Sequence, residues 1–231
     1  MELQFKQSQG NLFYLYTSDK ELENHFSNRS NCTKEILSQL DNLMYNFYFK
    51  NKKNLKVLDI GANIGLFSAH VADCCDNIYS VEPTPSHFDN LKKVAANFNN
   101  ITPYNYALNE EDGIVKFYLS GSNSTMNSLI DRSNDNNVVE VEGIKLSSLI
   151  EKIGCQKIDF CKIDIEGSEL KAVTEQSVSE VSENIDNFFI EYHEVNNMNF
   201  SQLTNHFTNI FENCGYKCEK IAIDAIFAQK I

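Results

Sequence analysis

Acidic and imidazole side chains follow two apolar segments that are each predicted to form a strand. Asp164 and Glu166 lie at the end of one segment, and Glu191 and His193 lie at the end of the other. Ligands of open α/β sheets bind outside the carboxyl ends of the strands, so we expect these groups to meet at one site on neighbouring strands. A carboxylate or an imidazole at this place can accept a proton from a bound hydroxyl group.

The role of proton acceptor has three candidates. His193 is favoured because its ordinary pKa lies nearest to neutral pH, while Asp164 or Glu191 could orient it or act instead. In a purely structural interpretation, Glu191 and His193 only pair with Lys162 or with a helix terminus. A divalent metal ion on Asp164, Glu166, Glu191 and His193 is a further alternative, but this ligand set is not diagnostic and a site without metal is favoured.

A second feature is the segment Asp59–Gly65, which reads Asp-Ile-Gly-Ala-Asn-Ile-Gly between a predicted strand and a predicted helix. Gly61 and Gly65 accept positive φ angles and let a ligand approach the backbone, and the helix N-terminus offers free N–H groups. Glu82 ends the next predicted strand, where an acidic residue typically binds the hydroxyl groups of a ribose. The two features together predict a cofactor that contains adenosine.

The details of this loop distinguish between adenosine cofactors. Dinucleotide folds use a GxGxxG pattern that seats a pyrophosphate on the helix N-terminus. Here the third glycine is absent, and the carboxylate of Asp59 would repel a pyrophosphate but attract an ammonium group. The pattern favours S-adenosylmethionine, which carries an ammonium and a sulfonium group and no phosphate. An NAD(P)-dependent oxidoreductase and a non-catalytic nucleotide-binding module of Rossmann type are the alternatives.

From Leu55 onward, predicted strands and helices alternate along the chain. The main strands are predicted at Lys56–Ile60, Asn77–Val81, Ile101–Leu108, Lys157–Ile165, Asn187–Tyr192, Tyr216–Ala222 and Ala225–Ile231. The helices are predicted at Ile64–Cys74, Ser86–Phe98, Leu146–Gly154, Glu169–Ser182 and Ser201–Cys214. This order predicts an α/β, Rossmann-like fold with seven strands, mostly parallel, because strand–helix alternation produces parallel crossovers. The final hairpin makes the last strand antiparallel.

Residues 1–54 are predicted to form a cap on the main domain of residues 55–231. The cap contains a β-hairpin around Gly10-Asn11, a short helix opened by a capping box at Ser18–Glu21, and a helix over Thr33–Phe49. A further hairpin is predicted from Gly113–Leu119 and Val138–Val141, and the polar segment Ser120–Asn137 between them is a long loop. Such a loop is either a lid over a bound ligand or a solvated linker.

Composition excludes some partners. The chain has 231 residues, a net charge of −12 and seven cysteines. A strongly acidic chain does not suit a nucleic-acid backbone or an anionic membrane surface, so we expect a small-molecule or glycan-precursor substrate. The absence of paired CxxC spacing, of a signal peptide and of a long apolar run favours a cytoplasmic protein with reduced thiols and no membrane insertion. The oligomeric state is not indicated.

Three motifs in order resemble the FkbM-type methyltransferases over about Leu55 to Glu194. They are Asp59–Gly65 (DIGANIG), Glu82-Pro83-x-Pro85 followed by Leu91 and Asn97, and Lys162–Glu169 (KIDIEGSE). The resemblance implies a class I methyltransferase fold, S-adenosylmethionine as donor, and mostly hydroxyl acceptors on sugars or small metabolites.

The resemblance also implies roles for single residues. The residues implied to line the methionine part of the donor are Gly61, Ala62, Asn63 and Gly65. Asp59 would face the ammonium side, Glu82 the ribose, and Pro83 the adenine edge, with Asn105 and Ala107 also at the adenine. Asp164 would lie close to the methyl group and the acceptor. One departure is Ser147, which stands where an acid is expected after Leu146.

Overall fold

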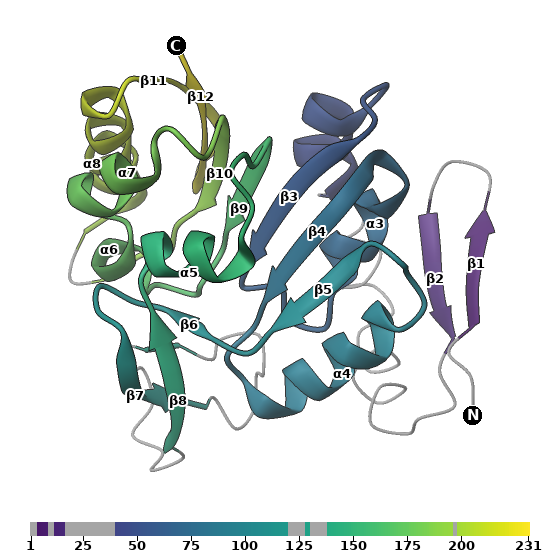
Figure 1. Ribbon diagram of the computed structural model, residues 1–231. Coiled ribbons are helices and arrows are strands. Elements are labelled where there is room, and N and C mark those ends of the chain that lie inside the picture. Colours follow the sequence, from purple (N-terminus) through teal and green to yellow (C-terminus); the bar gives the residue numbers. More distant parts are fainter. Residues whose placement is uncertain (1–3, 9–11, 17–39, 120–127, 130–137, 196–197) are drawn as a thin grey trace.

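The computed structural model describes residues 4–8, 12–16, 40–119, 128–129, 138–195 and 198–231. Seven strands form the central sheet in the order β11-β12-β10-β9-β3-β4-β5. Their bounds are Leu55–Ile60 (β3), Cys75–Val81 (β4), Ile101–Tyr104 (β5), Phe160–Ile163 (β9), Asn187–Glu191 (β10), Tyr216–Ala222 (β11) and Ala225–Lys230 (β12). The pairs among β5, β4, β3, β9 and β10 are parallel, and β12 is antiparallel to both of its neighbours. The predicted sheet and its antiparallel last strand are confirmed (Figure 1).

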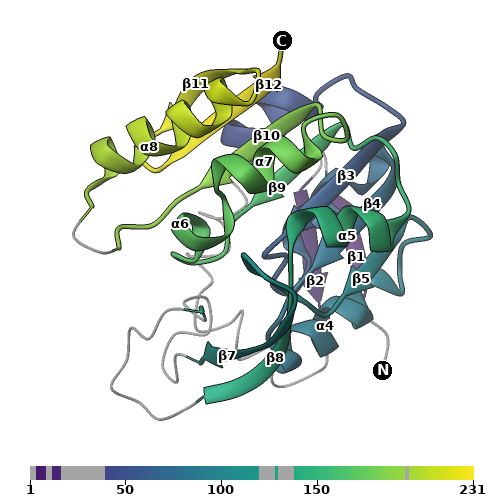
Figure 2. The same cartoon turned by 60° about the vertical axis from the view of Figure 1, so that its left-hand side comes forward.

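Alternating apolar side chains cover both faces of this sheet, as expected for strands buried on two sides. One face carries Leu58, Cys161 and Phe188 and packs against helices α5 (Leu146–Ile153), α7 (Glu175–Val181) and α8 (Phe200–Asn213). Figure 2 shows these three helices on the near side of the sheet. The other face carries Val57 and Phe160 and packs against α3 (Leu66–Val71), α4 (Pro85–Ala95) and η1 (Leu40–Phe49).

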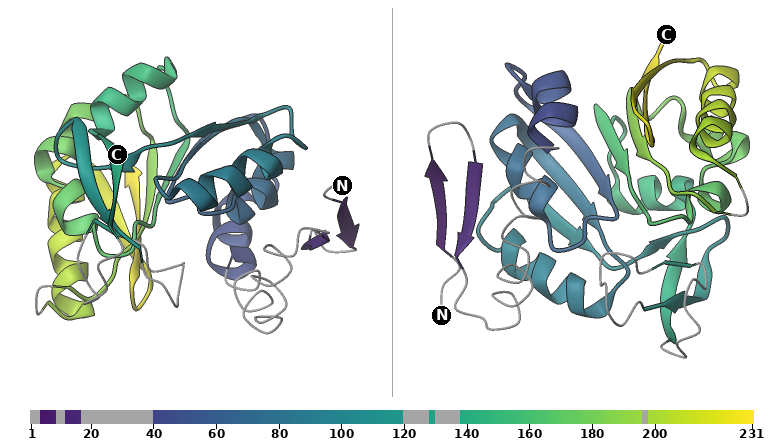
Figure 3. Two further views of the ribbon diagram at one scale, coloured as in Figure 1. Left: turned by 90° about the horizontal axis from the view of Figure 1, so that it is seen from below. Right: turned by 180° about the vertical axis from the view of Figure 1, so that it is seen from behind.

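The N-terminal part begins with the predicted hairpin. Strands β1 (Gln4–Ser8) and β2 (Leu12–Tyr16) pair antiparallel, and they lie outside the seven-stranded sheet (Figure 3). Element η1 is a π-helix whose Met44, Tyr48 and Phe49 are buried in the core of the main domain. The predicted capping box at 18–21, the residues before Leu40 and the hairpin turn lie outside the described residues. The division into a cap and a main domain stays a prediction.

The prediction of one continuous strand over residues 101–108 is wrong, because this segment forms two strands that belong to different sheets. β5 ends at Tyr104, and β6 (Ala107–Leu108) joins a small sheet of order β6-β8-β7 with β7 (Gly113–Tyr118) and β8 (Val138–Ile144). The Asn105 side-chain amide donates to the carbonyls of Glu82 and Pro83, at 2.7 and 3.1 Å, and holds the chain at the break. The predicted pairing of 113–119 with 138–141 is confirmed.

The predicted helix over 169–182 is also divided, into α6 (Glu169–Ala172) and α7. A capping box restarts the helix, because the Thr174 hydroxyl accepts from the N–H of Ser177 and the Ser177 hydroxyl accepts from the N–H of Thr174. The short element η2 (Ala72–Cys74) likewise ends the helix that was predicted to run to Cys74. These breaks leave the order of the elements unchanged.

Two general expectations can be compared with the described residues. Among them, no helix combines the length and the apolar character needed to cross a membrane. The six cysteines in the described part of the chain are free thiols. Most of the long loop 120–137 lies outside the described residues. Its residue Ser128 is buried and bridges to Tyr118, and its hydroxyl lies 3.1 Å from that of Ser168.

Candidate active site

The loop after β3 is folded against the end of β4. The N–H groups of Gly61 and Ala62 both donate to the carbonyl of Val81, each at 2.9 Å. Gly61 has a φ of 80°, and a Cβ on it would collide with the carbonyl oxygen of Asp164. Glycine is therefore required at this position both by its conformation and by the close approach of the strand end beside it. The loop and the end of β9 are in direct contact.

Glu82 is held rigidly at the end of β4. The N–H of Asn63 donates to one oxygen of its carboxylate and the N–H of Thr84 donates to the other, both at 2.9 Å. The side chain is buried, and Nδ1 of His87 lies 3.6 Å from it. An ionised carboxylate has about four lone-pair sites, so each oxygen can still accept a bond from a ligand. Glu82 is suited to bind two neighbouring hydroxyl groups.

Asp59 lies beneath the loop and is completely buried. It accepts a 2.6 Å hydrogen bond from the hydroxyl of Ser68, and Nζ of Lys162 lies 3.9 Å from its other oxygen. Burial raises the pKa of Asp59, whereas Lys162 and Ser68 oppose this shift. In this structure Asp59 links the end of β3 to α3 through Ser68, and its predicted role toward the ammonium group of the donor stays a prediction.

The other residues predicted to lie at the adenine have different surroundings. Asn105 ties the ends of β4 and β5 together, and Pro83, one of its partners, is buried at the end of β4. Ala107 belongs to β6 and is buried with Phe117 and Val141 in the core of the small sheet. Asn105 therefore shapes the strand end next to Glu82, and Ala107 contributes to the neighbouring core.

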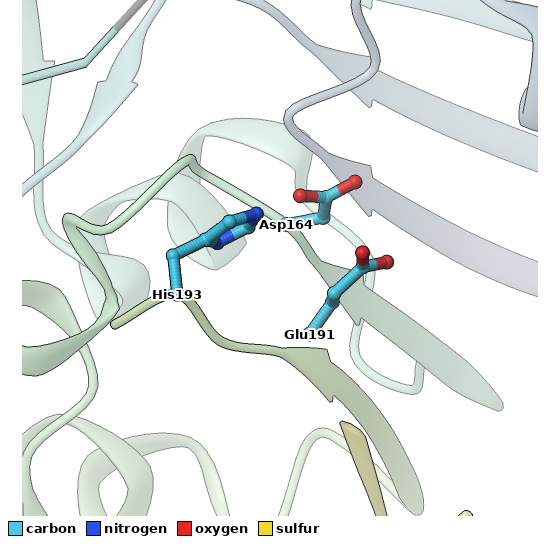
Figure 4. A group of neighbouring side chains, drawn as sticks. All are labelled: Asp164, Glu191 and His193. Atoms are coloured by element: carbon cyan, nitrogen blue, oxygen red, sulfur yellow. The ribbon is translucent and has the colours of Figure 1, made fainter. Parts of the chain in front are cut away.

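Asp164, Glu191 and His193 point toward one another at the ends of β9 and β10 (Figure 4). These strands are neighbours in the sheet, with Ile163 beside Ile190. One ligand-type atom from each of the three side chains lies within 4.8 Å of the others. The expected meeting of the two strand ends is confirmed.

The charges around these three groups are unevenly distributed. Nζ of Lys162 lies 2.9 Å from Asp164, and the side chain is 6% exposed. Burial lowers the pKa of Lys162, but Asp164 and Asp59 outweigh this and raise it above its ordinary value. Lys162 is thus a fixed ammonium group. The neighbouring Asp164 and burial raise the pKa of Glu191 to about 8, against the opposing effect of Lys162 and His193.

His193 lies between two further carboxylates. Its Nδ1 is 3.2 Å from Oε1 of Glu169, and its Nε2 is 3.4 Å from Oε2 of Glu166. Burial lowers the pKa of His193, but Glu169, Asp164 and Glu166 together raise it to about 9. The imidazole is therefore protonated at neutral pH in this arrangement.

Comparison with known proteins identifies the family. A model of the FkbM methyltransferase domain matches residues 59–218. The chain belongs to this family. Among solved structures, the methyltransferase FkbM from Methylobacillus flagellatus KT is 19% identical, with a TM-score of 0.52 over 80% of this chain and 46% of that chain. The fibrillarin pre-rRNA processing protein of Methanococcus jannaschii is 16% identical, with a TM-score of 0.50 over 77% and 66%.

The solved structures are similar to this chain in fold. At such identities the solved structures show the fold, and the chain spans less than half the length of the solved FkbM methyltransferase. No curated protein matches the chain. The family match places the chain in the FkbM methyltransferase family, and its fold is class I methyltransferase-like, as the sequence motifs indicated.

Within this FkbM methyltransferase, the structure adds residues to which the sequence assigned no role. Glu169 is the clearest, because it is buried and contacts His193, although it ends the KIDIEGSE motif and could have been suspected from that position. Lys162 was considered only as a pairing partner. Ser147, the departure from the family pattern, donates to Glu180 on the exposed side of α5 and α7. Ser147 therefore stabilises the contact between two helices and is not part of the group of charged side chains at the strand ends.

The three side chains at the ends of β9 and β10 could also bind a metal ion. Asp164, Glu191 and His193 have suitable atom types and proximity. However, Lys162 already pairs with Asp164, and both nitrogens of His193 face other carboxylates. The arrangement favours proton transfer over a metal centre, and the absence of a metal requirement stays a prediction.

Proposed function

We propose that this FkbM-family methyltransferase transfers the methyl group of S-adenosylmethionine to a hydroxyl group of a sugar or small metabolite. The observation that carries the donor assignment is Glu82, which two backbone N–H groups fix while its oxygens keep free acceptor sites. A ribose diol is the complement of such a carboxylate. S-Adenosylmethionine supplies an electrophilic methyl group on a sulfonium.

The glycine loop supports a donor without phosphate. Gly61, Ala62, Asn63 and Gly65 turn at the end of β3, and Gly65 has a φ of 90° at the start of α3. All four of their N–H groups are already bonded: those of Gly61 and Ala62 to Val81, that of Asn63 to Glu82, and that of Gly65 to the carbonyl of Ala62. The loop thus has few N–H groups left for a pyrophosphate. This favours the methyl donor over a dinucleotide such as NAD(P).

The acceptor side of the proposal concerns a hydroxyl group. Methyl transfer to oxygen requires the hydroxyl proton to be removed and the donor and acceptor to be held in line. Asp164, Glu191 and His193 lie together at the ends of β9 and β10, and the end of β9 also contacts the donor loop at Gly61. A small acceptor suits a protein with a net charge of −12 better than a nucleic-acid backbone does.

Calorimetry with S-adenosylhomocysteine and with NAD tests the donor assignment. We expect S-adenosylhomocysteine to bind to one site and NAD not to bind. The opposite result would replace the proposal with that of an oxidoreductase. A screen of nucleotide sugars, glycan precursors and small alcohols for release of S-adenosylhomocysteine then tests the acceptor class, and turnover of only amines or RNA would refute hydroxyl methylation.

A further inference from the structure

Glu169 is an unusual carboxylate for a solvent-facing reaction site, because its side chain is 1% exposed. Its Oε1 accepts hydrogen bonds from the N–H groups of Ile165 and Gly167, both at 3.0 Å, and lies 3.2 Å from Nδ1 of His193. Burial of a carboxylate costs free energy, which the three partners at Oε1 offset, whereas Oε2 has no hydrogen-bond partner among the described residues. Glu169 therefore connects the turn after β9 with the histidine after β10.

The turn that Glu169 holds is conformationally costly. Glu166 has a φ of 56°, in the left-handed region that non-glycine residues rarely adopt. Such a conformation persists only when surrounding contacts enforce it. The two hydrogen bonds that the Glu169 carboxylate accepts from the N–H groups of the turn provide that enforcement. As a result, the Glu166 carboxylate lies 3.4 Å from Nε2 of His193.

The two ring nitrogens of His193 therefore each face an acceptor. A neutral imidazole has one N–H and one lone pair, whereas the imidazolium has two N–H donors. When both carboxylates are ionised, only the doubly protonated form donates to Glu166 and Glu169 at the same time. In that form the ring has no lone pair with which to remove a proton from a substrate.

We propose that Glu169 is a positioning residue that, together with Glu166, holds His193 as an imidazolium and leaves Glu191 as the group that accepts the substrate's proton. This inference rests on the proposed methyl transfer to a hydroxyl group. In that step the O–H bond breaks and its proton passes to the Glu191 carboxylate. A C–O bond forms as the S–CH₃ bond breaks, and its electron pair stays on sulfur to give a neutral thioether.

The charged neighbours explain why Glu191 and not Asp164 is the base. Asp164 is neutralised by the ammonium group of Lys162 at 2.9 Å. Glu191 has the negative charge of Asp164 beside it, is largely buried, and also faces Asp224 from the turn between β11 and β12, which together raise its pKa and make its carboxylate a better proton acceptor. The positive charge of His193 partly offsets this repulsion. Fixing the imidazolium thus keeps the basic form of Glu191 accessible near neutral pH.

The state of His193 can be measured without an acceptor substrate. In the ¹⁵N-histidine-labelled protein with S-adenosylhomocysteine, we expect both ring nitrogens of His193 to stay protonated well above pH 7, with the signal assigned by loss in His193→Gln. Glu169→Gln should move the His193 titration to lower pH. A neutral His193 at pH 7 in the unchanged protein would overturn the proposal.

The pH profile of kcat/KM gives a readout whose sign separates the two bases. If Glu191 is the base, Glu169→Gln weakens the imidazolium and moves the rising limb to higher pH. If His193 is the base, removing an adjacent carboxylate moves the limb to lower pH, and that result, or no shift, would refute the assignment. Glu175→Gln, an exposed glutamate that begins α7, is the matched control and should not shift the limb.

Folding and donor binding are checked separately. Glu166→Gln should give the same direction of shift as Glu169→Gln, and it remains available if the buried substitution does not fold. In both variants S-adenosylhomocysteine should bind as in the unchanged protein. If the unchanged protein does not bind S-adenosylhomocysteine, the proposed function is refuted. The effect of the substitutions on the His193 titration tests only the positioning role of Glu169.

Discussion

The ends of β3 and β4 and the ends of β9 and β10 form two adjacent parts of one site, and they are built differently. At β3 and β4, backbone N–H groups fix a glycine turn and the single carboxylate of Glu82. At β9 and β10, the main contacts join charged side chains from two separate strands. The first part is suited to recognition by shape and hydrogen bonds, and the second to the movement of a proton. Substitutions should therefore separate donor binding from turnover.

The largest effect is expected from Glu191→Gln. Loss of a general base lowers the rate by about 10²–10⁴-fold, so kcat should fall by that order while S-adenosylhomocysteine binding stays unchanged. Steady-state kinetics and calorimetry on the same preparation measure the two quantities. A variant that keeps most of its kcat would show that the β9–β10 end does not supply the base.

Glu82→Gln should have the converse effect on donor affinity. Hydrogen bonds to a charged group contribute about 1.5–3 kcal/mol, which corresponds to a loss of about 10–100-fold in affinity. Calorimetric titration with S-adenosylhomocysteine measures this loss. Asp76→Asn, an exposed acid near the start of the same strand, serves as control. Equal effects of the two substitutions would indicate that Glu82 does not contact the donor.

The unliganded protein should lose stability as the pH rises from about 6 to above 9. The pKa of His193 is raised to about 9 and that of Glu191 to about 8, so the folded state binds more protons than the unfolded state over this range. The melting temperature should therefore fall with rising pH. Glu191→Gln should flatten this dependence, because it removes one of the two titrating groups. A melting temperature that rises over the same range would contradict the charge arrangement.

The smallest effect is expected from chelation. If Lys162 and His193 supply the positive charges of the site, treatment with EDTA should change neither the donor affinity nor kcat by more than about twofold, a shift of roughly 0.4 kcal/mol. Restoration of lost activity by added Mg²⁺ or Mn²⁺ would instead support the metal alternative.

The sequence by itself determined the family, the strand–turn–helix around Gly61, the position of Glu82, and the placement of Asp164 and Glu191 at neighbouring strand ends. These features depend on local periodicity and on the rule that parallel strands present their carboxyl ends at one edge. Most strand and helix positions could be predicted for the same reason. The breaks at Asn105 and Thr174 could not, because side-chain hydrogen bonds there override the apolar pattern.

Only the tertiary structure decided which charged residues contact one another. It buried Asp59 beneath the loop, placed Lys162 between Asp59 and Asp164, and brought Glu169 against His193, which is 24 residues away in the chain. From the sequence alone, His193 is favoured as the base because the ordinary pKa of an imidazole lies nearest to neutral pH. Burial and the charges of neighbours from other strands set the actual pKa, and those neighbours are determined by the fold.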